Sequence, residues 1–270
     1  MGKRITTALV LIPIVLAAVW FLPTQWFALC IALIAILGAW EWSALLRYGV
    51  QGRVCYCLGV ASVCALTYFL LPPSTTALPV YAGFIWWVLA GISLFFVAHQ
   101  AWWWFLSGIA VLLLGWYGLV WIHGLRHGPQ LVIELFFLIW IADSAAYFFG
   151  KRFGRRKLAP RLSPGKTIEG LIGALLAAFV FALITAGLVL QPNLAGLLVL
   201  AGVCVIVVLA SVLGDLFESQ LKRSAGVKDS GTWLPGHGGI LDRVDSILAA
   251  APVFAIGVLT IFPMLGITRP

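Results

Sequence analysis

Long apolar runs separated by short polar segments make up most of this chain, and that pattern predicts membrane-spanning helices. A helix needs about 20 predominantly apolar residues to cross the hydrocarbon core of a bilayer. By this measure the chain has about nine candidate spans: Ile5–Leu22, Trp26–Leu46, Val54–Leu71, Val80–Ala98, Trp102–Ile122, Leu131–Phe149, Ile168–Leu190, Leu194–Leu213 and Ser246–Phe262. The runs do not alternate between apolar and polar positions, which argues against a β-barrel. We therefore predict an all-α, polytopic membrane protein.

The composition supports a membrane protein and narrows its partners. Charged residues make up 10% of the chain and hydrophobic residues 63%, whereas soluble domains have about 25% charged residues. The net charge is +8, which in a membrane protein points to topology and to anionic headgroups. The chain lacks the ladder of aromatic and basic residues that single-stranded nucleic acid would need. We expect the bilayer as a partner and no nucleic acid.

The distribution of Lys and Arg predicts the orientation of the chain. With nine spans and a cytoplasmic N-terminus, all of these residues except Arg126 and Arg269 fall on the cytoplasmic side, which is 15 of 17. Positive residues favour cytoplasmic loops. The threading leaves two long cytoplasmic segments, Gly150–Thr167 and Gly214–Asp245. We expect a multi-pass protein of the cell inner membrane whose N-terminus and chemistry face the cytoplasm.

Polar residues are divided unevenly between the two halves of the chain. Residues 1–125 carry few polar signals and are expected to form an N-terminal transmembrane scaffold. Residues 126–270 are expected to form a transmembrane catalytic region with cytoplasmic loops at 150–167 and 214–245. Within it, Ser219–Asp245 concentrates eight ionisable side chains and five glycines in 27 residues. Cations, carboxylates and a flexible backbone are what a site for phosphate and metal needs.

Carboxylates stand at the cytoplasmic ends of three predicted helices. Asp215 ends the eighth span, Asp143 lies near the cytoplasmic end of the sixth, and Asp242 and Asp245 precede the ninth. The three-residue spacing puts the last two on one face if their segment is helical. Acids at membrane depth are costly and tend to mark function, and Mg²⁺ prefers oxygen ligands. The set indicates a Mg²⁺ site; for any single acid the alternative is an ion pair with an arginine such as Arg243.

Cations accompany these acids. Lys222 and Arg223 extend the helix that bears Asp215, and Lys228 lies in a glycine-flanked turn beyond it. Lys166 belongs to an S-P-G-K-T-x-E segment that opens the seventh span, where a helix N-terminus favours anions. The spacing of a P-loop is absent. We expect these four cations to contact phosphate, whereas the basic residues earlier in the same loop set topology or bind lipid headgroups.

His237 lies in a P-G-H-G-G sequence between the cations and the carboxylates. A histidine there can hydrogen-bond a phosphate or a base edge, or simply order the loop, and the sequence does not choose between these roles. Taken together, the residues predict a cytoplasm-facing membrane site for Mg²⁺ and a polyphosphate. Phosphoryl or nucleotidyl transfer is the natural reaction class, because it depends mainly on positioning and charge neutralisation.

The stretch from Ser219 to Asp245 also resembles a known family signature. Its pattern S-x-L-K-R-x4-K-D-x-G-x2-L-P-x-H-G-G-I-x-D-R-V-D is similar to that of the phosphatidate cytidylyltransferases, also called CDP-diacylglycerol synthases. The resemblance extends to the S-P-x-K-T-x-E-G segment at Ser163–Gly170, to the segment around Asp143, and to length and span count. The first hundred or so residues match only in character.

This resemblance implies an activity in phospholipid biosynthesis. The family makes CDP-diacylglycerol and pyrophosphate from CTP and phosphatidic acid with Mg²⁺, and a monovalent cation such as K⁺ is thought to act beside it. By analogy Asp215 and Asp242 are the expected metal ligands and catalytic residues, with Asp143 and Asp245 as further catalytic candidates. The resemblance also implies an all-helical fold of the family's own type and a homodimer.

The same analogy assigns substrate contacts. The basic side chains would neutralise the CTP phosphates and the phosphatidate headgroup, and the remaining polar residues would order the loops or the nucleotide. Lys222 and Arg223 are expected to be catalytic. The expected substrate-binding residues are Ser163, Lys166, Lys228, Asp229, His237 and Arg243.

Two other readings of the sequence lead to different functions. A CTP-dependent polyprenol or phytol kinase shares the membrane setting and the need for cations, but it releases CDP and not pyrophosphate. A transporter with a cytoplasmic gate would show paired halves and broken helices. The chain shows neither feature, and its ionisable residues gather on one side and not at the middle of the membrane.

Overall fold

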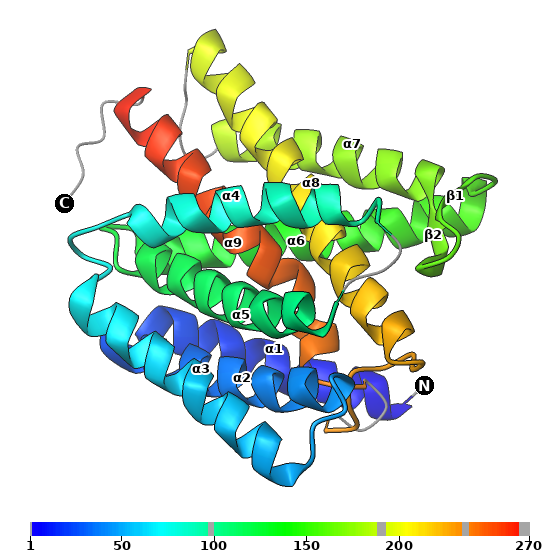
Figure 1. The fold of residues 1–270 in the computed structure, drawn as a ribbon. Coiled ribbons are helices and arrows are strands. Elements are labelled where there is room, and N and C mark those ends of the chain that lie inside the picture. The colour runs from blue at the N-terminus through cyan, green and yellow to red at the C-terminus, as the bar shows by residue number, and fades with distance from the viewer. Residues whose placement is uncertain (1, 97–99, 188–192, 234–237, 265–270) are drawn as a thin grey trace.

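The structure is a computed structural model that describes residues 2–96, 100–187, 193–233 and 238–264. These residues form nine helices and one two-stranded sheet (Figure 1). The elements are α1 (Gly2–Phe21), α2 (Thr24–Leu45), α3 (Val50–Leu70), α4 (Leu78–Ser93), α5 (Ala101–His123), α6 (Gly128–Phe153), β1 (Lys157–Ala159), β2 (Ser163–Thr167), α7 (Ile168–Thr185), α8 (Leu194–Ser224) and α9 (Leu241–Met264).

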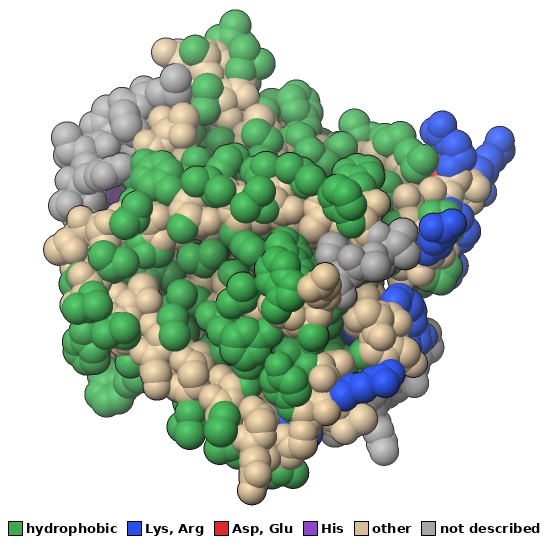
Figure 2. Space-filling view, in the orientation of Figure 1, with side chains coloured by type: hydrophobic (Ala, Val, Ile, Leu, Met, Phe, Trp, Pro, Cys, Tyr) green, Lys and Arg blue, Asp and Glu red, His purple; other side chains and the backbone are tan. Residues whose placement is uncertain are grey.

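Each predicted span overlaps a helix, which confirms the all-α membrane class. The last residues of the spans predicted at Val80–Ala98 and Ile168–Leu190 lie outside the described residues. Seven helices among the described residues are long and apolar enough to cross a bilayer. The other two, α4 and the Leu9–Phe21 part of α1, are shorter apolar helices, so a count of nine spans stays a prediction. Large apolar side chains cover much of the surface in Figure 2, and Phe69 and Phe21 are each 77% exposed. Lipid solvates such side chains, so their exposure fits a protein embedded in a membrane.

Helix α8 continues beyond the span predicted for it. The segment from Asp215 to Ser224 is rich in Leu, Glu, Gln, Lys and Arg, which favour helix, and basic residues in the last turn suit the negative end of the helix dipole. The helix stops before Gly226, which has φ +78°, and Val227 N donates to Lys222 O at 2.9 Å. The segment 214–245, expected as a cytoplasmic loop, is therefore helical at both ends.

The other expected loop, 150–167, contains the antiparallel hairpin β1–β2, in which Lys157 pairs with Thr167. Glu169 in the first turn of α7 fixes this hairpin to the end of α6. Its Oε2 accepts from the backbone N–H of Arg155 at 3.0 Å and of Arg156 at 3.2 Å. The Glu169 carboxylate therefore holds the start of α7 against the residues that follow α6, and this contact helps to position the S-P-G-K-T segment of β2.

An aromatic cluster holds the last turns of α8 against the first half of the chain. Phe217 is 1% exposed and its ring lies 5.4 Å from Trp104 of α5, 5.9 Å from Trp87 of α4 and 6.5 Å from Trp42 of α2, measured between ring centroids. Trp42 Nε1 also donates to Trp104 O at 2.9 Å, so its buried polar atom is satisfied. The helices of the first half thus fix the part of α8 that carries charged residues.

Helix α8 packs closely on α9 at Gly214. A Cβ built on Gly214 would lie 2.5 Å from Asp245 O and 2.7 Å from Ala249 Cβ. Small residues allow such close approach between membrane helices. The contact stands directly beside Asp215, so the glycine brings the acids of α8 and α9 together.

Replacing Gly214 by alanine should therefore separate the two helices and destabilise the protein by about 1–3 kcal/mol, the usual cost of overpacking. Gly202 of the same helix is a matched control, because a Cβ there meets nothing within 4 Å. Gly202→Ala should leave the unfolding temperature in detergent unchanged or slightly raised. Equal unfolding temperatures for the two variants would show that the α8–α9 contact at Gly214 tolerates a side chain.

The charged ends of the helices lie together at one edge of the molecule. In Figure 2 the Lys and Arg side chains visible on this face gather at the edge where Figure 1 shows the hairpin, the start of α1 and the end of α8. The end of α9 lies at the opposite edge. The polar chemistry therefore belongs to one end of the helical bundle.

Candidate active site

A cavity of about 840 Å³ opens at this charged edge, between α6, the hairpin, α7, α8 and α9. Its volume lies in the range of small-molecule sites. Eleven of the twelve predicted site residues line it: Asp143, Ser163, Lys166, Asp215, Lys222, Arg223, Lys228, Asp229, Asp242, Arg243 and Asp245. The twelfth, His237, lies outside the described residues.

Asp215 joins α8 to the hairpin. Its Oδ2 lies 2.6 Å from the Nζ of Lys166, and its Oδ1 accepts from Ser219 Oγ at 3.2 Å, one turn along the helix. The Asp215 side chain is 34% exposed and that of Lys166 26%, so both groups face the cavity. The ion pair fixes the hairpin lysine against α8 at Asp215.

Asp242, in the first turn of α9, accepts hydrogen bonds on both of its carboxylate oxygens. Its Oδ1 accepts from Lys222 Nζ at 2.6 Å. Its Oδ2 accepts from the backbone N–H of Ser230 at 2.9 Å and of Gly239 at 2.8 Å, and from Ser230 Oγ at 3.0 Å. Charge-assisted bonds of this kind are the strong ones. Asp242 therefore holds Ser230 and Gly239 at the start of α9.

Lys222 links this carboxylate to a second one. Its Nζ lies 3.4 Å from Oε1 of Glu218, one turn before it on α8. The Lys222 residue is 8% exposed and Glu218 3% exposed, so this is a buried network. A buried charge is costly unless it is paired, and Lys222 balances two acids at once.

The remaining acids lie nearby. Asp143 of α6 interacts electrostatically with Lys166, Asp215 and Asp245. Asp242 and Asp245 both lie in the first turns of α9 and line the same cavity, which confirms the predicted shared helix face. The sequence left open whether the acids pair with an arginine; Asp215 and Asp242 pair with lysines.

Arg223 has a structural role as well as a place in the cavity wall. Its Nε donates to Leu162 O in the hairpin and its Nη1 to Val227 O beyond α8, each at 3.2 Å. Lys228 and Asp229 are exposed at the edge of the same cavity. The predicted cations therefore converge on the acids from the hairpin, from α8 and from the segment that follows it.

Sequence reasoning missed one buried acid. Glu41 of α2 is 2% exposed, and its carboxylate accepts from the N–H of Ile240 and of Leu241, each at 2.9 Å. Its Oε2 also lies 2.9 Å from Ser230 Oγ, whose single proton Glu41 shares with Asp242. Glu41 is the sole charged residue of α2, and an acid at membrane depth is itself a functional signal. That signal was available in the sequence, but its partners, about 200 residues away, were not.

The donor set can be tested against a divalent cation. Among the described residues, no group of three or more His, Cys, Asp and Glu side chains is arranged to hold a metal ion. Mg²⁺ is usually held by one or two carboxylates together with substrate phosphates, so Asp215 and Asp242 are enough in number. Glu218 is buried in the same network, where it interacts with Lys222 and Asp245. The acids present therefore fit Mg²⁺ that is shared with a phosphate ligand.

The charges of the cavity wall favour the same combination. Six cationic side chains and five acidic ones line it, which gives a formal charge of +1. The cations are Lys151, Lys166, Lys222, Arg223, Lys228 and Arg243, and the acids are Asp143, Asp215, Asp229, Asp242 and Asp245. A polyphosphate is attracted by the first group and repelled by the second unless a metal ion intervenes.

Comparisons with known proteins show the family of the chain. A family model described as the cytidylyltransferase family matches residues 2–261. A phosphatidate cytidylyltransferase of Pseudomonas aeruginosa is 42% identical over 260 residues, 94% of this chain and 95% of that protein. One of Haemophilus influenzae is 37% identical over 94% of this chain and 96% of its own. An uncharacterised Escherichia coli protein, YnbB, is 36% identical over 79% of this chain and 67% of its own. The chain thus belongs to the cytidylyltransferase family.

Proposed function

We propose that the protein transfers the cytidylyl group of CTP to phosphatidic acid, forming CDP-diacylglycerol and pyrophosphate in phospholipid biosynthesis. The observation that carries this proposal is one cavity, at the charged end of a membrane bundle, in which lysines from two elements meet carboxylates from three helices. Full-length relatives that are named phosphatidate cytidylyltransferases support it.

The reaction needs little from the protein beyond positioning and charge. A phosphate oxygen of phosphatidate attacks the α-phosphorus of CTP, the bond from that phosphorus to the β-phosphate oxygen breaks, and pyrophosphate leaves. A phosphate monoester already carries about −1.5 to −2 charges at pH 7, so no covalent nucleophile or strong base is required. Holding two anions together is the main barrier, and the clustered cations lower it.

The residues divide into two groups on this proposal. Lys166, Lys222, Arg223 and Lys228 bind the phosphates of CTP and the lipid headgroup. Asp215 and Asp242 would hold Mg²⁺, which would neutralise charge on the triphosphate and on the leaving pyrophosphate. A phosphate ligand would compete with the two carboxylates for Lys166 and Lys222.

The setting suits one soluble and one lipid substrate. Phosphatidate leaves the bilayer only at high cost and CTP cannot enter it, whereas the cavity lies at helix ends where both can meet. The positive-inside distribution of Lys and Arg supports a cytoplasmic active site and N-terminus in the inner membrane. A homodimer is part of the same proposal and is tested by the mass of the detergent-purified protein.

A product assay tests the activity. With CTP and phosphatidate, the purified protein should release pyrophosphate and form labelled CDP-diacylglycerol, and EDTA should stop both. Release of CDP with a phosphorylated lipid would identify a kinase and overturn the proposal. Turnover that is unaffected by EDTA would remove Mg²⁺ from the mechanism.

A second assay tests the monovalent cation. We include K⁺ beside Mg²⁺ in the proposed site, since several carboxylates face one cavity. Replacing K⁺ by tetramethylammonium at constant ionic strength should lower the rate several-fold without changing the product. An unchanged rate would exclude a K⁺ requirement.

A further inference from the structure

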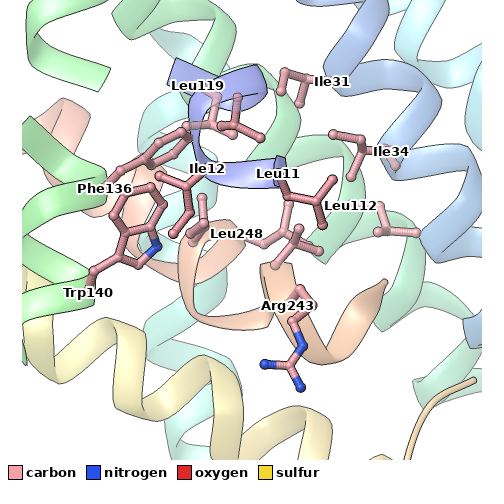
Figure 3. A pocket seen from close by; sticks show the side chains of 14 residues that line it. Leu11, Ile12, Ile31, Ile34, Leu112, Leu119, Phe136, Trp140, Arg243 and Leu248 are labelled. Atoms are coloured by element: carbon pink, nitrogen blue, oxygen red, sulfur yellow. The ribbon is translucent and has the colours of Figure 1, made fainter. Parts of the chain in front are cut away.

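A second cavity, of about 370 Å³, lies among α1, α2, α5, α6 and α9 (Figure 3). Its wall is apolar apart from Arg243 and the indole nitrogen of Trp140; among its side chains are Leu11, Ile34 and Leu248. In Figure 3 Arg243 stands at one end, with its guanidinium directed away from the apolar side chains. The cavity therefore has an apolar interior and one charged end.

This apolar cavity adjoins the polar one. Trp140, Arg243 and Ile247 line both. An apolar cavity of about 150 Å³ holds a benzene molecule, so 370 Å³ has room for about a dozen carbons or more. An acyl chain of that size would lie next to the polar cavity, where a phosphate attached to it could bind.

We propose that the apolar cavity binds one acyl chain of the lipid substrate while the phosphate lies in the polar cavity. This rests on the proposed function and adds a chain-length determinant to it. Each buried CH₂ contributes about a factor of four to binding. The cavity therefore favours long-chain over short-chain phosphatidate, and the two ends of the lipid are fixed by neighbouring sites.

Filling the cavity tests this proposal. Ile34→Trp on α2 places an indole in it, whereas Leu33→Trp, one residue away, is a matched control because Leu33 is 62% exposed on the lipid side. Both variants and the parent protein are assayed with dioleoyl and with dihexanoyl phosphatidate. Ile34→Trp should lower kcat/KM at least about tenfold for the dioleoyl lipid and little for the dihexanoyl lipid. Leu33→Trp should change neither.

The outcomes separate the two proposals. If Ile34→Trp affects both lipids equally, or neither, the acyl-chain assignment is wrong although the activity stands. If the parent protein turns over neither lipid, the proposed function itself fails. If Ile34→Trp does not fold, Leu119→Phe fills the same cavity from α5. It is then tested by the same measure, the ratio of kcat/KM for the dioleoyl lipid to kcat/KM for the dihexanoyl lipid.

A different observation carries a second inference, about Glu41. The two backbone N–H groups that it binds begin α9, and the Ser230 hydroxyl that it binds lies 3.0 Å from Asp242 Oδ2. A carboxylate at a helix N-terminus satisfies orphan N–H groups and suits the helix dipole. A Cβ on Gly239 would clash with both Glu41 and Ser230, so the packing there is close.

We infer that Glu41 is a positioning residue, which holds the start of α9 and thereby the Asp242 carboxylate. Glu41→Gln should lower kcat about 10- to 100-fold with little change in KM for CTP, the loss expected for hydrogen bonds to a charged group. Glu134→Gln, a second intramembrane acid that lines neither cavity, should retain parental activity.

A double-mutant cycle tests whether Glu41 acts through Ser230. If it does, Glu41→Gln combined with Ser230→Ala should lose about as much activity as Glu41→Gln alone, because the two residues share one network. Losses that multiply, or a Glu41→Gln variant with parental kcat, would overturn the inference. If Glu41→Gln does not fold, Ser230→Ala alone must lower kcat without raising KM for CTP.

Discussion

Replacing Asp215 by asparagine is expected to lower turnover at least about 100-fold, the scale of losing charge stabilisation in an active site. The amide keeps the shape of the side chain, and the group is partly exposed with Lys166 and Ser219 as its bonded partners. The expression level and the unfolding temperature in detergent should therefore change little. Initial rates across a Mg²⁺ titration are the measurement.

Asp242→Asn should be equally inactive but less stable. Its Oδ2 accepts three hydrogen bonds, and an amide NH₂ in that place would face N–H donors. Glu134→Gln serves as the control for removing an acid within the membrane. Near-parental rates in both Asp215→Asn and Asp242→Asn would disprove their assignment as metal ligands.

Replacing Lys222 by alanine is the second large effect that we expect. The substitution leaves Glu218 and Asp242 without their shared cation, and breaking a buried pair costs about 3–5 kcal/mol. The variant should unfold at a lower temperature and need more CTP or phosphatidate for half-maximal rate. Arg155→Ala is the matched control, because the Arg155 side chain is exposed and lies outside the cavity.

A double substitution separates the two contributions of Lys222. Glu218→Gln added to Lys222→Ala removes the buried acid that would be left without its lysine partner, and should restore part of the stability without restoring activity. If Lys222→Ala and Arg155→Ala have equal effects on the substrate requirement, the sorting of the cations into phosphate-binding and topology-setting groups is wrong. Full recovery of activity in the double variant would show that Lys222 only balances charge.

The parts of the site that follow from local pattern were predictable. Apolar run lengths located the helices, and the three-residue spacing of Asp242 and Asp245 fixed their shared face. The continuation of α8 past its apolar span, through Lys222 and Arg223, was predicted as well, but hydropathy marks only where a span ends and did not give the last helical residue, Ser224. Helix propensity and the αL glycine at 226 decide that end.

Pairing over long sequence distances could not be predicted. Nothing local says that Lys166 meets Asp215, or that Glu41 meets the start of α9, since both depend on how helices pack. Residues 1–125 were expected to serve as scaffold, yet their one acidic side chain, Glu41, bonds to Ser230 beside the site. A single acid in an apolar helix indicates a functional position, but only the folded structure shows which residues it binds.

The Arg223 guanidinium couples two segments far apart in the sequence. Because it donates both to Leu162 O and to Val227 O, the hairpin and the turn after α8 form a single mechanical unit. A chimaera that exchanges only one of these segments with a relative would disturb the two hydrogen bonds of Arg223. Grafting experiments should therefore transfer both segments together, with the arginine that connects them.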